Sequence, residues 1–78
     1  MHNVTIYSTP TCHFCHMAKD FFKENNIAFT DKNAATDMVA RKEAVTKSGQ
    51  MGVPVIDIDG KIVVGFNEAR IRELLEIK

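Results

Sequence analysis

The chain has 78 residues, which is enough for one hydrophobic core, so a single domain over residues 1–78 is expected. Ten Lys and Arg residues balance ten Asp and Glu residues, which argues against nucleic acid or an anionic membrane as a partner. No apolar stretch reaches the roughly 18 residues of a membrane span, and residues 1–5 show no signal-peptide pattern. The expected compartment is the cytoplasm, where thiols stay reduced and a disulfide is more often catalytic than structural.

The N-terminal third predicts a strand, a helix and a second strand. Residues 4–7 are rich in β-branched side chains and are followed by turn-forming residues, which indicates a strand. From Phe14 to about Asn25, apolar residues recur at three- and four-residue spacing, as on one face of a helix. Asn25-Asn26 ends this pattern, and Ile27–Thr30 reads as the second strand.

A second helix is predicted after Thr36. Thr36 is a candidate N-cap with Asp37 in the first turn, and Ser48-Gly49 supplies a stop. The expected buried positions are Met38, Val39 and either Ala44 or Val45. The charged side chains of this helix are expected to form a solvated face: Arg41, Lys42, Glu43 and Lys47.

The C-terminal part predicts a hairpin and a third helix. Asp59-Gly60 lies between two β-branched runs, which is the strongest short signal for a type I′ hairpin turn. Asn67 can cap a helix from Glu68 to about Ile77. The expected buried stripe of this helix is Ala69, Ile71 or Arg72, Leu74, Leu75 and Ile77.

These elements follow the order β-α-β-α-β-β-α. The first β-α-β unit requires a parallel pair of strands, and the hairpin adds two antiparallel strands. We therefore predict an α/β fold with a four-stranded mixed sheet and helices on both faces.

Cys12 and Cys15 are the only cysteines and are separated by His13-Phe14. A disulfide across so short a loop would stabilise the fold by roughly 2 kcal/mol in the chain-entropy model, against about 3 kcal/mol for a 15-residue loop. A redox role is therefore favoured over a structural role. If the helix begins near His13, Cys12 meets unpaired amides and the positive end of the helix dipole, which stabilise a thiolate.

The surroundings of this pair suggest the roles of its neighbours. A partly protonated His13 or His16 would add to the stabilisation of a Cys12 thiolate, although both histidines are equally compatible with solvent-exposed residues that have no role. Cys15, one turn inside the helix, is expected to be the more buried, resolving thiol. Tyr7 and Pro10 are expected to wall the site.

Val53-Pro54 stands at the entry to the hairpin. A proline there is compatible with a trans bond at the start of a strand and equally with a cis bond. A cis bond would turn the backbone of Val53 outward, where it could pair with an extended substrate beside Cys12.

Three features together resemble the glutaredoxin-like members of the thioredoxin superfamily: a strand followed by Cys-x-x-Cys and a helix, Val53-Pro54 before a hairpin, and Gly65-Phe66 before a last helix. The resemblance covers the whole chain. It implies a thioredoxin fold, attack by Cys12, resolution by Cys15 and a cis Pro54. The redox-active disulfide Cys12–Cys15 would be the working group, with no built-in cofactor.

The resemblance also implies where substrate binds and how the protein works. Val53, Pro54, Gly65 and Phe66 would border the substrate site, together with Tyr7, Pro10, His13 and Phe14 beside the cysteines. The expected function is that of a monomeric electron carrier that reduces disulfides in proteins.

Departures from the family pattern concern the electron donor. Glutaredoxins usually carry a basic residue three positions before the first cysteine, a Thr-Val-Pro and a Gly-Gly followed by Asp, which together hold glutathione. Here the matching residues are Thr9, Gly52-Val53-Pro54 and residues 65–68. This pattern is closer to the NrdH-type redoxins that accept electrons from thioredoxin reductase, and closest to the short bacterial group called YruB type. Thioredoxin reductase is therefore favoured as donor over glutathione.

The cysteine motif has two other readings. Cys12–His16 matches the Cys-x-x-Cys-His pattern of haem c attachment, but that attachment requires export. A metal-binding or metal-delivery module using Cys12 and Cys15 is the alternative from another class, although zinc prefers four ligands and no second Cys-x-x-Cys exists.

Overall fold

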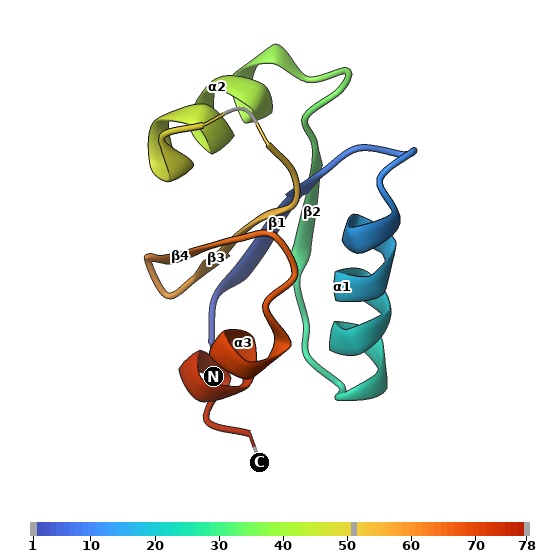
Figure 1. Cartoon of the computed structure of the whole chain (residues 1–78), viewed down its shortest axis with the longest axis vertical. Coiled ribbons are helices and arrows are strands. Elements are labelled where there is room, and N and C mark those ends of the chain that lie inside the picture. Colours follow the sequence, from blue (N-terminus) through green and yellow to red (C-terminus); the bar gives the residue numbers. More distant parts are fainter. Residues whose placement is uncertain (1, 51, 78) are drawn as a thin grey trace.

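The computed structural model describes residues 2–50 and 52–77 and contains a four-stranded mixed sheet with the strand order β2-β1-β3-β4 (Figure 1). β1 pairs in parallel with β2 and antiparallel with β3, which pairs antiparallel with β4. The predicted order of elements is confirmed. In chain order the elements are β1 (Val4–Ser8), α1 (His13–Glu24), β2 (Thr30–Asn33), α2 (Met38–Ser48), β3 (Val55–Ile58), β4 (Lys61–Val64) and α3 (Glu68–Leu75).

The sheet separates two layers of helices, as Figure 1 shows. Alternate residues of a strand point to opposite faces, so Ile6 and Ile56 face α1 and α3 while Tyr7 and Val55 face α2. The larger core lies on the α1 and α3 face. Its buried members are Val4, Ile6, Ala18, Phe21, Phe22, Ile56, Ile58, Val63, Ile71 and Leu75.

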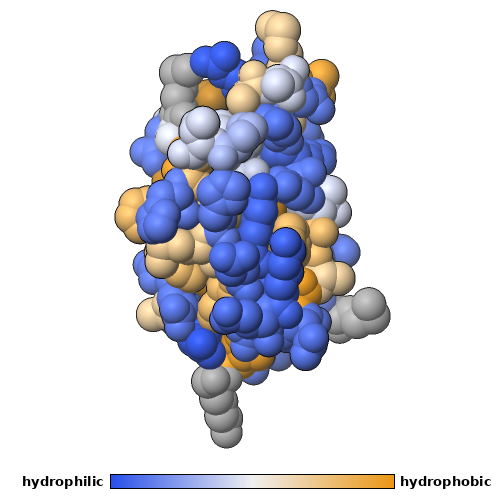
Figure 2. Space-filling model, turned by 90° about the vertical axis from the view of Figure 1, so that its right-hand side faces the viewer, coloured by the Kyte–Doolittle hydropathy of each residue, from blue (hydrophilic) through white to orange (hydrophobic). Residues whose placement is uncertain are grey.

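The outward face of α1 is hydrophilic, as the spacing predicted. Figure 2 shows this side of the molecule, where hydrophilic side chains predominate. Asp20, Lys23 and Glu24 are exposed, whereas Ala18, Phe21 and Phe22 are buried. Met17 belongs to the same apolar spacing, but its expected burial is wrong, because it is 38% exposed. No helix in the described part of the chain has the length and apolar character needed to cross a bilayer.

The second strand does not lie where the sequence suggested. Ile27–Thr30 was expected, but β2 runs from Thr30 to Asn33, because these polar residues form the edge of the sheet, where one side of the strand faces solvent. Thr30 to Asn33 pair in register with Thr5 to Ser8 of β1, and the Ser8 hydroxyl donates a hydrogen bond of 2.8 Å to Asp31 Oδ1. The apolar residues Ile27 and Phe29 pack against the larger core from the segment that leads into the strand.

Helix α2 also differs from its prediction. Asp37, not Thr36, is the N-cap, and its carboxylate accepts hydrogen bonds from the amides of Val39 and Ala40. The expected burial of Met38 and Val39 is wrong, because these side chains are 82% and 69% exposed. The helix packs on Tyr7 and Val55 through two small residues, Ala40 and Ala44, which lie one turn apart.

The hairpin and the last helix follow the sequence closely. Asp59 and Gly60 have φ values of 52° and 88°, the positive values that a type I′ turn requires. Asn67 caps α3 by accepting a hydrogen bond from the Arg70 amide. The helix ends at Leu75, two residues earlier than expected, and buries Ile71 and Leu75, whereas Ala69 is exposed.

The close approach of α2 to the sheet leads to a stability prediction. Ala40 is 1% exposed, so Ala40→Leu should lower the free energy of unfolding by about 1–3 kcal/mol because the added carbons have no room. Val39→Leu on the exposed side of the same helix should change it by less than about 0.5 kcal/mol. Urea unfolding followed by circular dichroism measures both values. Equal effects of the two changes would show that α2 does not pack through Ala40.

Candidate functional site

Cys12 occupies the N-cap of α1. Its backbone is extended, with φ −87° and ψ 113°, and its Sγ accepts a hydrogen bond of 3.2 Å from the Cys15 amide. This sulfur therefore meets one of the amides that a helix start leaves without a partner, on the side where the helix dipole is positive. Cys12 is also partly exposed, so an incoming disulfide can reach it.

Cys15 has no exposed surface. Burial, together with the hydrogen bond and the charge of Cys12, raises the pKa of its thiol to about 12, and the Thr9 backbone and Lys19 only partly oppose this. At neutral pH Cys15 is consequently a protonated thiol next to an accessible one. The structure thus provides two free cysteines that differ in exposure, Cys12 being partly exposed and Cys15 buried.

This difference predicts how the two thiols respond to iodoacetamide. At pH 7.5 the wild-type protein should be alkylated on Cys12, with modification of Cys15 at least about a hundredfold slower, since only the thiolate reacts and Cys15 is buried. Because the raised pKa keeps the thiolate a minority form, Cys15 alkylation should rise about tenfold per pH unit between pH 8 and 10. Peptide mass spectrometry gives both rates. Similar rates for Cys12 and Cys15 at pH 7.5 would contradict the assignment.

Three hydrogen bonds hold the turn that carries Cys12. The Cys12 amide donates to Thr9 O over 3.3 Å, and the His16 amide donates to Cys12 O over 3.2 Å. His16 Nε2 lies 2.8 Å from Pro10 O. Because a carbonyl oxygen only accepts, Nε2 carries the proton in this contact. The His16 side chain therefore fastens the Pro10 backbone to the first turns of α1.

The His16 contact predicts a role in positioning Cys12. His16→Phe should slow alkylation of Cys12 by iodoacetamide about fivefold at pH 7, the factor that corresponds to one hydrogen bond of about 1 kcal/mol. His16→Gln, whose amide can donate to Pro10 O, should recover part of the rate. The readout is the alkylation rate between pH 5 and 9, measured beside the thermal midpoint. A lower midpoint with an unchanged alkylation profile would assign His16 a purely structural role.

The loop before β3 closes the other side of the site. The Val53–Pro54 peptide bond is cis, as the family resemblance implied, and Pro54 is buried. Pro54 O accepts a hydrogen bond of 2.8 Å from the Gly65 amide, whose φ of 79° suits glycine. This contact links the loop that carries Pro54 to the loop before α3.

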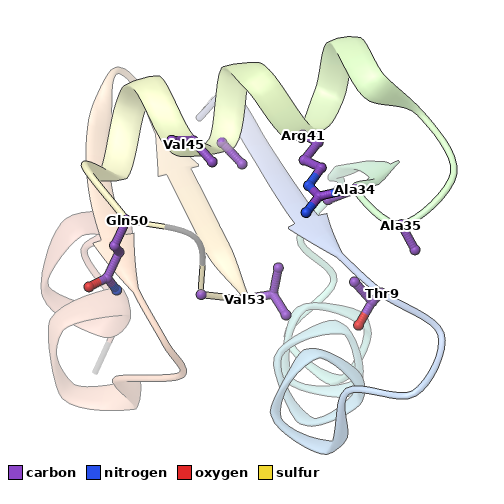
Figure 3. Close-up of a pocket in the computed structure, with 9 residues that line it drawn as sticks. Thr9, Ala34, Ala35, Arg41, Val45, Gln50 and Val53 are labelled. Atoms are coloured by element: carbon purple, nitrogen blue, oxygen red, sulfur yellow. The ribbon is translucent and has the colours of Figure 1, made fainter.

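A cavity of about 280 Å³ lies between the Cys12 turn and α2 (Figure 3). Thr9 and Val53 both line it, so the turn that precedes Cys12 and the residue that precedes Pro54 share one hollow. Arg41 extends into it from α2, and Gln50 borders it. The cavity thus offers one guanidinium and one amide beside Thr9 and Val53.

Arg41 is exposed, as expected for the solvated face of α2, but the sequence did not predict that it also lines the cavity. Arg41 lies in the sequence between Ala40 and Ala44, the two residues through which α2 packs on the sheet. A small residue on each side of Arg41 is therefore the sequence pattern that could have predicted its place at the cavity. Lys47 is likewise exposed, and its Nζ in addition donates to the Tyr7 hydroxyl over 3.0 Å and contacts Asp57 Oδ2 over 2.7 Å. These bonds raise the pKa of Lys47 above its ordinary value.

The remaining predicted site residues lie in different environments. Phe14 is 57% exposed, with its ring edge-on to His13 at a centroid distance of 5.6 Å, and Pro10 is exposed. Phe66 is half-buried against Phe21. Tyr7 has no exposed surface and faces α2, so its placement gives no support to the expected role as a wall of the substrate site.

Within residues 2–50 and 52–77, no three His, Cys, Asp or Glu side chains gather into a group that could hold a metal ion. The metal-binding alternative therefore gains no support from the geometry of this part of the chain.

Comparison with known proteins agrees with this geometry. The family model described as glutaredoxin matches residues 4–63. The chain belongs to the glutaredoxin family. Glutaredoxins with a Cys-x-x-Cys pair at the start of α1 are thiol–disulfide oxidoreductases. The enzyme class expected from the sequence is therefore confirmed.

Similar relatives cover most of this glutaredoxin. An uncharacterized glutaredoxin-like 8.6 kDa protein in the rubredoxin operon of Clostridium pasteurianum is 53% identical, over 94% of this chain and 97% of its own length. Glutaredoxin 3 of Escherichia coli K12 is 32% identical, over 87% of this chain and 82% of its own length.

Solved structures confirm the predicted thioredoxin-like fold. A mutant form of a thioredoxin-like protein has a TM-score of 0.92 and 31% identity, with all of both chains covered. The NrdH-redoxin of Escherichia coli has a TM-score of 0.80 and 26% identity, over 92% of this glutaredoxin and 93% of its own chain.

Proposed function

We propose that this glutaredoxin reduces disulfides in proteins through a two-cysteine mechanism. The thiolate of Cys12 attacks one sulfur of the substrate disulfide, which forms a mixed disulfide and releases the other substrate sulfur as a thiolate. Cys15 then attacks the Cys12 sulfur, forms the Cys12–Cys15 disulfide and releases the second substrate thiol. The observation that carries this proposal is the pairing of an accessible Cys12 at the N-cap with a buried Cys15 one turn later.

The raised pKa of Cys15 fits the order of these steps. Part of the shift comes from the hydrogen bond and the charge of Cys12, and both disappear once the Cys12 sulfur is bonded to substrate. Cys15 then loses its proton more readily, and the departing substrate thiolate takes up a proton. The resolving thiol is therefore inert in the free protein and becomes activated in the mixed disulfide.

Substrate is proposed to bind across the two loops beside Cys12. The backbone of Val53, next to the cis Pro54, supplies hydrogen-bonding groups for an extended segment, while Phe14 and His13 present an exposed aromatic surface. Pro10, Gly65 and Phe66 are proposed to complete the border. Hydrogen bonds to backbone are independent of substrate sequence, which suits reduction of several protein disulfides.

Thioredoxin reductase is the proposed electron donor. Thr9 occupies the position where glutaredoxins usually carry a basic residue, and Gly52 replaces the Thr of Thr-Val-Pro. The similarity in fold to an NrdH-redoxin supports the same choice. The cytoplasm is the proposed compartment, because reduced thiols persist there.

A glutathione-dependent reaction is the second candidate, and one observation favours it. Arg41 lines the cavity beside Thr9 and Val53, so a cation is available there for the carboxylate of a small thiol. The identity to glutaredoxin 3 points the same way.

The donor is tested by comparing two reducing systems with the same substrate. Reduction of bis(2-hydroxyethyl) disulfide is followed by NADPH oxidation, once with thioredoxin reductase and once with glutathione and glutathione reductase. The proposal expects turnover with thioredoxin reductase and little with glutathione. Turnover that depends on glutathione alone would establish the second candidate, and Arg41→Glu should then raise the KM for glutathione about tenfold, as expected for loss of a charged contact.

A further inference from the structure

The outer face of α2 carries large apolar side chains that the fold does not use. Met38 and Val39 are 82% and 69% exposed, while the helix packs on the sheet through Ala40 and Ala44. Met38 and Val39 border a hollow of about 560 Å³, together with Arg41, Lys42, Val45 and Thr46. We refer to these six residues as the α2 groove. A contiguous apolar hollow of this kind is typical of a recognition surface.

The charges around the α2 groove are of one sign. Within the described residues, Arg41 and Lys42 form no ion pair, whereas the nearby Glu43 is neutralised by Lys32 at 3.1 Å. Lys47 likewise is paired with Asp57 at 2.7 Å. The charges left without an intramolecular partner at the groove are therefore two cations. A complementary occupant carries carboxylates beside an apolar side chain.

The α2 groove adjoins the cavity that Thr9 and Val53 line. Arg41 and Val45 line both the groove and the cavity. Figure 3 shows these two residues with Thr9 and Val53 around the cavity. A chain that lies in the groove therefore leads toward the Cys12 turn. The occupant that fits this path is a segment of the same protein whose disulfide is exchanged.

We propose that the α2 groove binds an acidic segment with apolar side chains in the protein redox partner and so selects which disulfides reach Cys12. This proposal rests on the proposed function, and it adds the chemical class of the partner surface. The apolar side chain of the segment covers Met38 and Val39, and its carboxylates face Lys42 and Arg41.

The test uses two synthetic peptide disulfides that differ only in one arm. Each has a disulfide at one end and, after a flexible Gly-Ser linker, either two Glu or two Lys residues flanking two Leu residues. The wild-type protein should reduce the acidic peptide with a kcat/KM about tenfold above that of the basic peptide, a preference equivalent to about 1.4 kcal/mol. Equal values for the two peptides would overturn the proposal.

Matched variants locate the preference on the protein. Lys42→Glu should remove most of the preference for the acidic peptide, and Val39→Asp should lower kcat/KM for the acidic peptide about fivefold. Lys61→Glu is the control, because Lys61 is an exposed lysine next to the hairpin turn and lines neither hollow. An equal loss of preference in Lys61→Glu would show a general charge effect and overturn the proposal.

Two further measurements separate this proposal from its alternatives. Bis(2-hydroxyethyl) disulfide is neutral and too small to occupy the groove, so its reduction reports the dithiol chemistry alone. If the protein reduces this small disulfide but shows no preference between the two peptides, the docking proposal fails and the proposed function stands. If it is not reduced, the proposed function itself fails. A wild-type dimer in sedimentation that Val39→Asp dissociates would assign the groove to a second copy and also overturn the proposal.

Discussion

Replacement of Cys12 by Ser should abolish disulfide reduction, with a loss of at least about a thousandfold in kcat/KM. The reason is chemical, because a serine hydroxyl at the N-cap is not ionised at neutral pH and does not attack a disulfide. In the wild-type protein the Cys15 amide donates a hydrogen bond of 3.2 Å to the Cys12 sulfur. The serine hydroxyl can accept the same hydrogen bond, so the helix start should remain intact. NADPH oxidation with bis(2-hydroxyethyl) disulfide as substrate measures the loss.

The control for this variant is its stability. The thermal midpoint of Cys12→Ser should match that of the reduced wild-type protein, which separates lost chemistry from lost structure. Retention of wild-type activity in a folded Cys12→Ser protein would contradict the proposed mechanism. This holds whichever reductase supplies the electrons.

Replacement of Cys15 by Ser should have a different result, the accumulation of covalent complexes. Cys12 still attacks a protein disulfide, but no second thiol releases the product, so mixed disulfides should persist through Cys12. With insulin as substrate, non-reducing electrophoresis should show a band that dithiothreitol removes. Serine is close to cysteine in size, so the packing around position 15 should change little. The main loss of stability should come from burying the serine hydroxyl, since Cys15 is fully buried.

The double variant Cys12→Ser/Cys15→Ser is the matched control for trapping. It should keep the fold and has no thiol, so no covalent band should form. If Cys15→Ser released product at the wild-type rate, resolution would have to come from a thiol outside the protein. If the band instead formed in Cys12→Ser, the roles of the two cysteines would be reversed.

The sequence predicted those parts of the structure that follow from local periodicity. Spacing of apolar residues located α1, Asp59-Gly60 located the hairpin turn, and Asn67 located the start of α3. The parallel pairing of β1 with β2 then followed from the β-α-β connection. In each of these cases, the residues that determine the element lie within the element.

Misplaced features depended on neighbours that are distant in the sequence. Thr30–Asn33 is polar and becomes a strand because β1 offers a free edge beside it. Ala40 and Ala44 are buried because the Tyr7 ring already fills the space below α2, and this in turn exposes Met38 and Val39. Arg41 reaches the cavity because that packing sets the rotation of the helix. Single-sequence patterns do not contain these pairings.

The polar character of β2 has a consequence for the behaviour of the protein in concentrated solution. An edge strand with unpaired amides and carbonyls is a template onto which another chain can add, and this is a common route to aggregation. Here the edge carries Asp31 and Lys32, and Lys19 contacts Asp31 at 2.7 Å across the edge. An incoming strand would have to disturb these charges before it could pair with the backbone. The residues that look least like a strand therefore protect this edge of the sheet from the addition of another chain.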